Sequence, residues 1–336
     1  MSKPNEKFIS IKDNEELILQ MISELVLQPR INAIKWSRLT KQTPNIKIGY
    51  PGQHLASLIT GMTGERTGAR GNDIIDGSEV KSCSRIDQLD VCNDCKLSVA
   101  RLEPNCPHCD SANVQRKDDS KWLIAIKNEN DLDVLLNQVG RVLLMLGDYP
   151  NFDKQDFETL RIQTFEIWPG EVRHHRFGEL MTNYYHKIYL SHKEKDSNKT
   201  PAPKNFWPYS YQFYLSNPVL TFSCTITNAN SEPQITIDHL TPPDIDRNTL
   251  TSVYMPTKIL KDTELVTLVS KLSQGELDSI TDTAVPKSKA IRMKASGLRE
   301  IIANVPEEIR SYLDLRDTDK IATAKKPYIR KVNQVN

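Results

Sequence analysis

The chain has 336 residues, more than one domain usually contains, so we expect two lobes or one enlarged α/β core. Hydrophobic residues make up 38% and charged residues 26% of the sequence, enough for a buried core beneath a polar surface. The net charge is only +1, so the overall basic excess of many nucleic-acid-binding proteins is absent. No run of about 18 apolar residues is present, which excludes a membrane-spanning helix. The N-terminus lacks the apolar run of a signal peptide, and we expect a cytoplasmic protein.

Positive charge is distributed unevenly along the chain. From residue 286 to the end there are twelve Lys or Arg residues against six Asp or Glu. Residues 171–204 hold seven against four, together with four of the seven histidines. The two segments predict a positively charged groove that binds a nucleic acid. Ordinary solvated helix faces give the same pattern, so this alternative stays open.

The N-terminal region predicts two helices. Apolar side chains recur at helical spacing over residues 14–25, after capping and acidic residues, and we expect that helix to end before Pro29. A second helix is expected over residues 54–60, closed by Gly61.

A hairpin is expected next. Asp76-Gly77 stands between the short extended runs 73–75 and 78–83, and Asp-Gly between two such runs is a hairpin turn signal.

Beyond the hairpin, helical and extended patterns alternate. We expect a strand at 122–126, a helix at 132–146, a strand at 165–168, a helix at 179–189, β structure over 209–238 and a mainly helical C-terminal region. The segment 193–208, rich in Lys, Asn and Pro, predicts a division into residues 1–195 and a C-terminal lobe of residues 196–336.

Four of the six cysteines form two Cys-x2-Cys pairs with ten residues between them. In a cytoplasmic chain this spacing indicates a metal site, because two tight turns bring four thiolates to a tetrahedral Zn²⁺ ion at ~2.3 Å. All four ligand positions are then filled, so we expect a structural zinc in an inserted knuckle at residues 90–112. The predicted ligands are Cys92, Cys95, Cys106 and Cys109.

The second run of the hairpin carries Glu79 and Lys81, which point to one face because residues i and i+2 of a strand share a face. An Asp precedes them at position 73 or 76. Two carboxylates suit Mg²⁺, a hard cation whose waters supply a nucleophile. A lysine orients or deprotonates that water, or neutralises charge that develops on a phosphate. The pattern therefore predicts a phosphodiesterase site.

The sequence from Asp73 through Glu79 to Lys81 resembles the PD-(D/E)xK nuclease superfamily, in particular type II restriction endonucleases and the mismatch-repair nicking enzyme MutH. The resemblance implies an α/β, restriction-endonuclease-like αβββαβ core. It also implies Asp73 and Glu79 as Mg²⁺ ligands and Lys81 as the residue that acts on water or charge. Asn72 replaces the proline that often precedes the Asp, and Asp76 remains an alternative ligand. With the inserted zinc knuckle, a more specific likeness is to the MamI-type restriction enzymes.

Basic residues outside the hairpin are candidates for contacts with DNA phosphates. Some lie in the loop before the hairpin, some in a histidine-rich segment, and others in the densest basic run of the chain. These residues are Arg66, Arg70, Arg173, Arg176, Lys287, Lys289, Arg292 and Lys294. For the helical ones, a polar helix face is the alternative interpretation. The P-loop pattern is absent, so no nucleotide cofactor is expected.

The sequence thus predicts a Mg²⁺-dependent, site-specific double-strand DNA endonuclease of a prokaryotic restriction system. Residues 1–195 form the expected nuclease core, and the mixed, largely helical C-terminal lobe serves DNA recognition or dimerisation. Because cutting both strands of a palindrome requires two active sites, a homodimer is expected. One alternative is a non-catalytic zinc-ribbon DNA-binding protein, which would function without Glu79 or Lys81. The other is a nicking or modification-dependent nuclease with the same chemistry.

Overall fold

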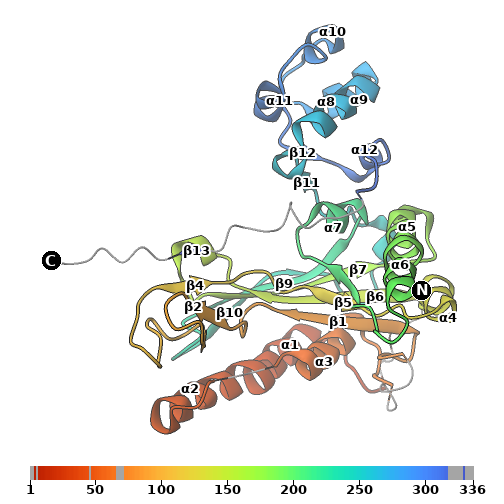
Figure 1. The fold of residues 1–336 in the computed structure, drawn as a ribbon. Coiled ribbons are helices and arrows are strands. Elements are labelled where there is room, and N and C mark those ends of the chain that lie inside the picture. Colours follow the sequence, from red (N-terminus) through yellow and green to blue (C-terminus); the bar gives the residue numbers. More distant parts are fainter. Residues whose placement is uncertain (1–3, 5–6, 45–46, 66–71, 317–327, 330–336) are drawn as a thin grey trace.

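The computed structural model describes residue 4 and residues 7–44, 47–65, 72–316 and 328–329. A five-stranded mixed sheet lies at its centre, with strand order β1-β6-β7-β9-β10 (Figure 1). β1 and β6 are parallel, and the other neighbouring strands are antiparallel. The strands are β1 (Ser78–Ser84), β6 (Arg141–Asp148), β7 (Leu160–Ile167), β9 (Val219–Thr227) and β10 (Gln234–Leu240).

Each face of the sheet contributes to a separate hydrophobic core. On β6, Leu143 and Met145 belong to one core, whereas Val142, Leu144 and Leu146 belong to the other. All eight residues of β6 are buried. A strand that is covered on both faces is apolar at nearly every position and shows no alternation.

The predicted helix over 132–146 is therefore wrong in its second half. Helical structure ends at Gln138, Gly140 follows in an irregular link, and the remainder is β6. Periodicity alone does not distinguish a short, fully apolar strand from a buried helix.

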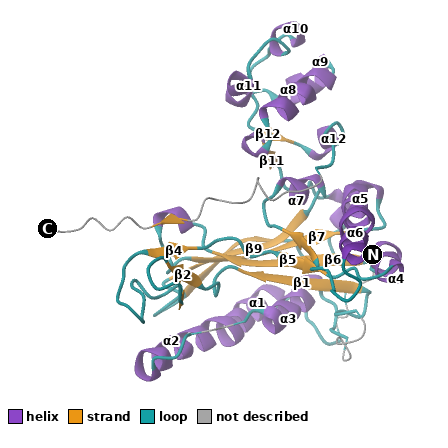
Figure 2. Cartoon of the chain, viewed as in Figure 1, coloured by secondary structure: helices purple, strands orange, loops and turns teal. Residues whose placement is uncertain are grey.

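Three helices cover the first face of the sheet (Figures 1 and 2). The first does not end before Pro29 as predicted, because the chain stays helical through a π-helical turn at Ser23–Leu27. Pro29 follows this π-helical turn, at the second residue of the next helix. The helices are α1 (Asn14–Ile22), α2 (Gln28–Thr40) and α3 (Gly49–Thr60), and the last confirms the helix predicted over 54–60.

A glycine allows α3 to approach β1 closely. A Cβ atom on Gly52 would overlap sterically with Ser82 Oγ. Any larger residue at position 52 would push α3 away from β1. The next residue of α3, Gln53, is thereby held beside the start of β1.

The opposite face is covered by short helices and by a two-stranded sheet (Figure 2). Trp122 Nε1 donates a hydrogen bond to the Met145 carbonyl of β6 at 2.8 Å, and its ring stacks on Phe213. The strand predicted at 122–126 therefore exists, but it pairs outside the central sheet. The elements are β5 (Trp122–Ile124), β8 (Lys204–Phe206), α4 (Glu129–Asp133), α5 (His175–Asn183), α6 (Leu190–Lys195) and α7 (Tyr211–Leu215).

The four cysteines lie in a small β module that is inserted between β1 and β5. Its strands are β2 (Asp90–Cys92), β3 (Ser98–Val99) and β4 (Val114–Arg116), and β13 (Tyr328–Ile329) pairs with β4. The fully buried Asp90 accepts hydrogen bonds from Arg101 and Arg116, each at 2.9 Å. The Arg101 guanidinium also lies 5.0–5.5 Å from the ring centroids of Tyr149, Phe152 and Phe157. The buried ion pairs thus stabilise the module internally, and the cation–π contacts attach it to the rings that follow β6.

The C-terminal lobe is largely helical, as predicted, and projects from the second face of the sheet (Figure 1). The predicted boundary at residue 195 does not separate it from the core, because β9 and β10 belong to the central sheet. The lobe instead begins at β11, near residue 255. It contains β11 (Met255–Pro256), β12 (Asn304–Val305), α8 (Asp262–Lys271), α9 (Gln274–Ile280), α10 (Lys287–Ala290), α11 (Ala295–Ile301) and α12 (Glu307–Arg310).

The predicted fold class, a mixed α/β core with an inserted cysteine cluster, is confirmed. Across the described residues, no helix has the length and apolar character that crossing a membrane requires.

Candidate active site

The chain enters β1 through a tight turn rather than a regular hairpin. The amides of Asp73 and Ile74 both donate to the Ser78 carbonyl, at 3.1 and 3.2 Å. The expected first arm is reduced to an isolated bridge between Ile74 and Gly64. Gly77 has φ +84°, so the Asp-Gly turn signal is confirmed although the expected ladder is absent.

Asp73 lies at the open edge of β1. Its Oδ2 accepts a hydrogen bond from the Val80 amide at 2.7 Å, and its Oδ1 accepts one from Gln53 Nε2 at 2.7 Å. β1 is an edge strand of the sheet, so the Val80 amide is available for a side chain. Helix α3 and strand β1 therefore fix one carboxylate oxygen each.

Glu79 and Lys81 lie next to this carboxylate and form an ion pair. Both side chains are partly exposed, at 24% and 30% of their area. Burial raises the pKa of Asp73, the Val80 amide lowers it, Glu79 raises it and Lys81 lowers it, with a net increase. Two carboxylates and one lysine thus leave a local excess of negative charge, which a cation would neutralise.

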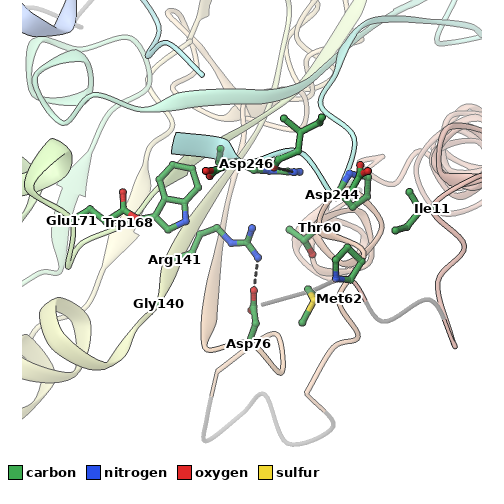
Figure 3. Close-up of a pocket in the computed structure, with 14 residues that line it drawn as sticks. Ile11, Thr60, Met62, Asp76, Gly140, Arg141, Trp168, Glu171, Asp244 and Asp246 are labelled. Atoms are coloured by element: carbon green, nitrogen blue, oxygen red, sulfur yellow. Dashed lines mark hydrogen bonds and ion pairs between the residues drawn. The ribbon is translucent and has the colours of Figure 1, made fainter. Parts of the chain in front are cut away.

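Asp76 is held differently from Asp73. Its Oδ1 accepts a hydrogen bond from the Ser78 amide at 3.1 Å, and its Oδ2 accepts one from Arg141 Nη2 (Figure 3). Both oxygens are therefore used within the protein, one of them by a buried guanidinium. Figure 3 shows this pair beside a cavity that Trp168 and Asp246 also line.

Sequence reasoning missed two residues around the turn. Gln53 directly precedes the helix predicted over 54–60, and no local pattern marks it as a partner of Asp73. Arg141 lies inside the predicted helix at 132–146, and a basic residue in such a helix is expected on its solvent-exposed face. Only the pairing of β1 with β6, which sets Arg141 opposite Ser78, brings it to the turn.

The four cysteines predicted as metal ligands come together. The Sγ atoms of Cys92, Cys95, Cys106 and Cys109 all lie within 4.8 Å of one another. The distance is 3.6 Å between Cys92 and Cys109 and 3.5 Å between Cys95 and Cys106. Four thiolates around a zinc ion at 2.3 Å would be about 3.8 Å apart, so the cluster fits a tetrahedral ion. These residues could form a zinc knuckle.

The predicted DNA-contacting residues have different environments. Arg66 and Arg70 lie outside the described residues. Arg173 donates to Glu307 and to the Leu250 carbonyl, and Arg176 donates to Glu179 and to two carbonyls of the lobe. The remaining four are on or next to α10. Lys287 is half-buried, whereas Lys289, Arg292 and Lys294 are exposed.

Comparison with known proteins gives the family of the chain. Residues 35–258, two thirds of the chain, match the family described as MamI restriction endonuclease. The chain belongs to the MamI restriction endonuclease family. The matched segment contains the turn, all four clustered cysteines and the whole central sheet, and it ends before α8. The suspected likeness to MamI-type enzymes is thereby confirmed.

A stretch of 56 residues is 39% identical to the type II restriction enzyme MamI of Microbacterium ammoniaphilum. It covers 17% of this chain and 18% of that enzyme, so the alignment spans less than a fifth of either protein. No solved structure matches the chain.

The raised pKa of Asp73 leads to a prediction about this MamI-family chain without metal. At any pH above the raised pKa, the ionised carboxylate of Asp73 lowers the free energy of unfolding. This destabilisation disappears as the pH falls toward 3.8, the ordinary pKa of an Asp side chain, because the carboxyl group is then protonated in the folded protein. Asp73→Asn should therefore stabilise the metal-free protein at neutral pH, by a small amount because solvent screens the charge. The gain should vanish in acid. Urea unfolding at pH 7.5 and pH 4 measures it.

Asp238→Asn is the matched control, because Asp238 lies on β10, the other edge strand of the sheet. Added Mg²⁺ should stabilise the wild type and the control but not Asp73→Asn. A variant that is less stable than wild type at pH 7.5 would contradict the charge argument.

Proposed function

We propose that this member of the MamI family is a Mg²⁺-dependent, site-specific endonuclease that cuts double-stranded DNA. The supporting observation is the grouping of Asp73, Glu79 and Lys81 at the open edge of β1. The grouping offers oxygen ligands of the kind that Mg²⁺ requires, and it has an excess of negative charge. DNA as the substrate class comes from the family match.

Each residue of the turn has a role in this proposal. Asp73 and Glu79 hold the ion, and Gln53 fixes the orientation of the Asp73 side chain. Lys81, paired with Glu79, orients the attacking water or neutralises charge on the scissile phosphate. Mg²⁺, when bound, supplies a water of lowered pKa and a positive charge beside the phosphate. We assign Asp73 rather than Asp76 as the ligand, because Asp76 is paired with the buried guanidinium of Arg141, whereas the hydrogen-bond donors to Asp73 are neutral.

The cysteine module has a structural role in this proposal. A Zn²⁺ ion with four thiolate ligands has no open position for substrate or water. The module contributes only a small apolar cluster of its own, so its fold depends on the metal.

The proposed DNA surface lies on the C-terminal lobe. Lys289, Arg292 and Lys294 are exposed and enter none of the ion pairs found among the described residues. Arg173 and Arg176 are engaged within the protein, so we propose no DNA contact for them. A cut in both strands requires two active sites, so the proposal includes a homodimer on DNA.

Cleavage of unmethylated phage DNA with Mg²⁺ tests the catalytic assignment. Wild-type protein should give discrete fragments. Lys81→Ala should slow cleavage by ~10²- to 10⁴-fold, because the proton-handling group is removed. Asp73→Ala should abolish cleavage, because a metal ligand is removed.

Lys127→Ala is the control, since Lys127 is an exposed lysine beyond β5. Retarded but uncut DNA with the wild type would favour the zinc-ribbon binding protein. Nicked plasmid, or cutting only of methylated DNA, would favour the second alternative. Normal cutting by both Lys81→Ala and Asp73→Ala would show that the active site is not at this turn.

Metal analysis tests the cysteine module. Wild-type protein should carry one zinc per chain, and Cys106→Ser should carry less than half, because three ligands bind zinc far more weakly than four. Amide hydrogen exchange should rise over residues 90–116 in that variant, while β6 and β7 stay protected. Cys224→Ser, on β9, should keep its zinc. Zinc-free wild-type protein with a protected module would refute the structural role.

Salt dependence tests the lobe as a DNA surface. Replacing Lys289, Arg292 and Lys294 together by Ala should weaken DNA binding and reduce the slope of log K against log salt by about 0.9 for each phosphate that the variant no longer neutralises. The matched triple is Lys35→Ala, Arg38→Ala and Lys41→Ala, three exposed cations on or next to α2. Equal effects from the two triples would indicate net charge alone and not a specific surface.

A further inference from the structure

The side chain of Arg141 ties the turn to the body of the sheet. Its Nε donates to Ser78 Oγ at 3.0 Å, and its Nη2 donates to Asp76 Oδ2. Its Nη1 donates to Glu166 Oε2 on β7 at 3.0 Å. All three nitrogen atoms of the guanidinium group therefore have protein partners. Arg141 is only 7% exposed, so these contacts are formed where most water is excluded.

A second arginine completes this network. Glu166 is fully buried, and its Oε1 lies 3.9 Å from Arg247 Nε. Arg247 in turn donates to the Ile59 carbonyl of α3 at 3.3 Å and to carbonyls of the 241–245 segment. Two guanidinium groups and two carboxylates balance in charge. Removing one member leaves a buried charge without its partner.

The turn has other supports, which act on its main chain. Ile74 is fully buried, and the Gly140 amide donates to the Gly77 carbonyl at 3.1 Å. The side chains at the tip add little, because Ile75 is exposed and residue 77 is a glycine. Without Arg141 the turn would keep only these main-chain supports, and the carboxylate of Asp76 would lose its cation.

Asp76 lies midway between the two proposed metal ligands, three residues after Asp73 and three before Glu79. A displaced Asp76 would change the spacing of those ligands and would also offer Mg²⁺ a competing carboxylate.

We propose that Arg141 is a positioning residue of the nuclease, which fixes the spacing of Asp73 and Glu79 and withholds Asp76 from the metal. The inference rests on the proposed function, because it assumes that those two carboxylates bind Mg²⁺. It adds a residue that touches neither substrate nor metal and acts through Asp76 and Ser78.

A cavity beside Arg141 makes a chemical rescue possible. Asp76 and Arg141 border a cavity of about 910 Å³ that Thr60, Trp168 and Arg247 also line (Figure 3). In Arg141→Ala, a guanidinium ion from solution has room to reach the vacated position beside Asp76. Such rescue distinguishes a missing cation from a general loss of packing.

The experiment measures Mg²⁺ dependence in Arg141→Ala and Arg141→Lys, with and without millimolar guanidinium chloride. One readout is the Mg²⁺ concentration that gives half-maximal cleavage. The second, which needs no DNA, is the Mg²⁺ concentration that gives half of the maximal shift in thermal unfolding. DNA affinity in metal-free buffer is measured alongside.

The matched control is Arg161→Ala. Arg161 also lies on the central sheet and pairs with Asp148 through two hydrogen bonds at 3.0 and 2.7 Å, at the opposite ends of β6 and β7. This variant removes a comparable ion pair far from the turn along the same two strands.

We expect the half-saturating Mg²⁺ concentration to rise about tenfold in Arg141→Ala. It should rise by less in Arg141→Lys, which keeps the positive charge but lacks the planar guanidinium group with its several donors. Guanidinium should reverse most of this shift, and DNA affinity should stay within about twofold of wild type. Arg161→Ala should keep the wild-type Mg²⁺ dependence and should not respond to guanidinium.

Unchanged Mg²⁺ dependence in the Arg141 variants would overturn the proposal, as would an equal shift in Arg161→Ala. If Arg141→Ala fails to fold, the lysine variant decides by the same two readouts. A wild-type protein whose unfolding is insensitive to Mg²⁺ would instead show that the proposed function fails, and this inference with it.

Discussion

The eight residues of β6 lie between two hydrophobic cores, and the other parts of the site are placed relative to them. The parallel pairing with β1 sets Arg141 opposite Ser78, at the entrance to the turn. The Met145 carbonyl accepts the hydrogen bond of Trp122, which brings the β5–β8 pair over the second face. Because β6 cannot shift without exposing apolar side chains on both faces, the edge strand beside it has a fixed register.

Two aspartates three residues apart have opposite environments on this frame. Asp76 accepts a hydrogen bond from the buried cation Arg141 and is part of a network whose charges balance. Asp73 accepts hydrogen bonds from the neutral groups of Gln53 and Val80, and the positive charge of Lys81 acts on it through solvent-screened electrostatics. Neutral donors orient a carboxylate without cancelling its charge, so Asp73 keeps its negative charge at the open edge of the sheet. The two carboxylates thus differ in their charge balance, and α3 orients Asp73 through its close approach to β1 at Gly52.

Local patterns predict those features that depend on neighbouring residues. The cysteine cluster follows from spacing, the Asp-Gly turn from its two residues, and the shared face of Glu79 and Lys81 from strand geometry. Long-range features escape such prediction for a common reason. The sequence of β6 carries no period because both of its faces are buried, and Gln53 and Arg141 meet the turn only through tertiary packing. The choice between Asp73 and Asp76 likewise depends on a partner 65 positions away along the chain.

The cysteine module has a consequence for the order in which the chain folds. β1 and β6 are neighbours in space, but 57 positions separate Ser84 from Arg141, so their parallel pairing closes a long loop. If residues 85–120 first become compact around a metal ion, the loop that remains is about a third as long, and its closure entropy falls by about 0.9 kcal/mol. Contact between Arg101 and the aromatic rings that follow β6 would then guide the two strands together. A metal ion bound by the four cysteines would thereby speed the pairing of β1 with β6, which forms the edge of the central sheet.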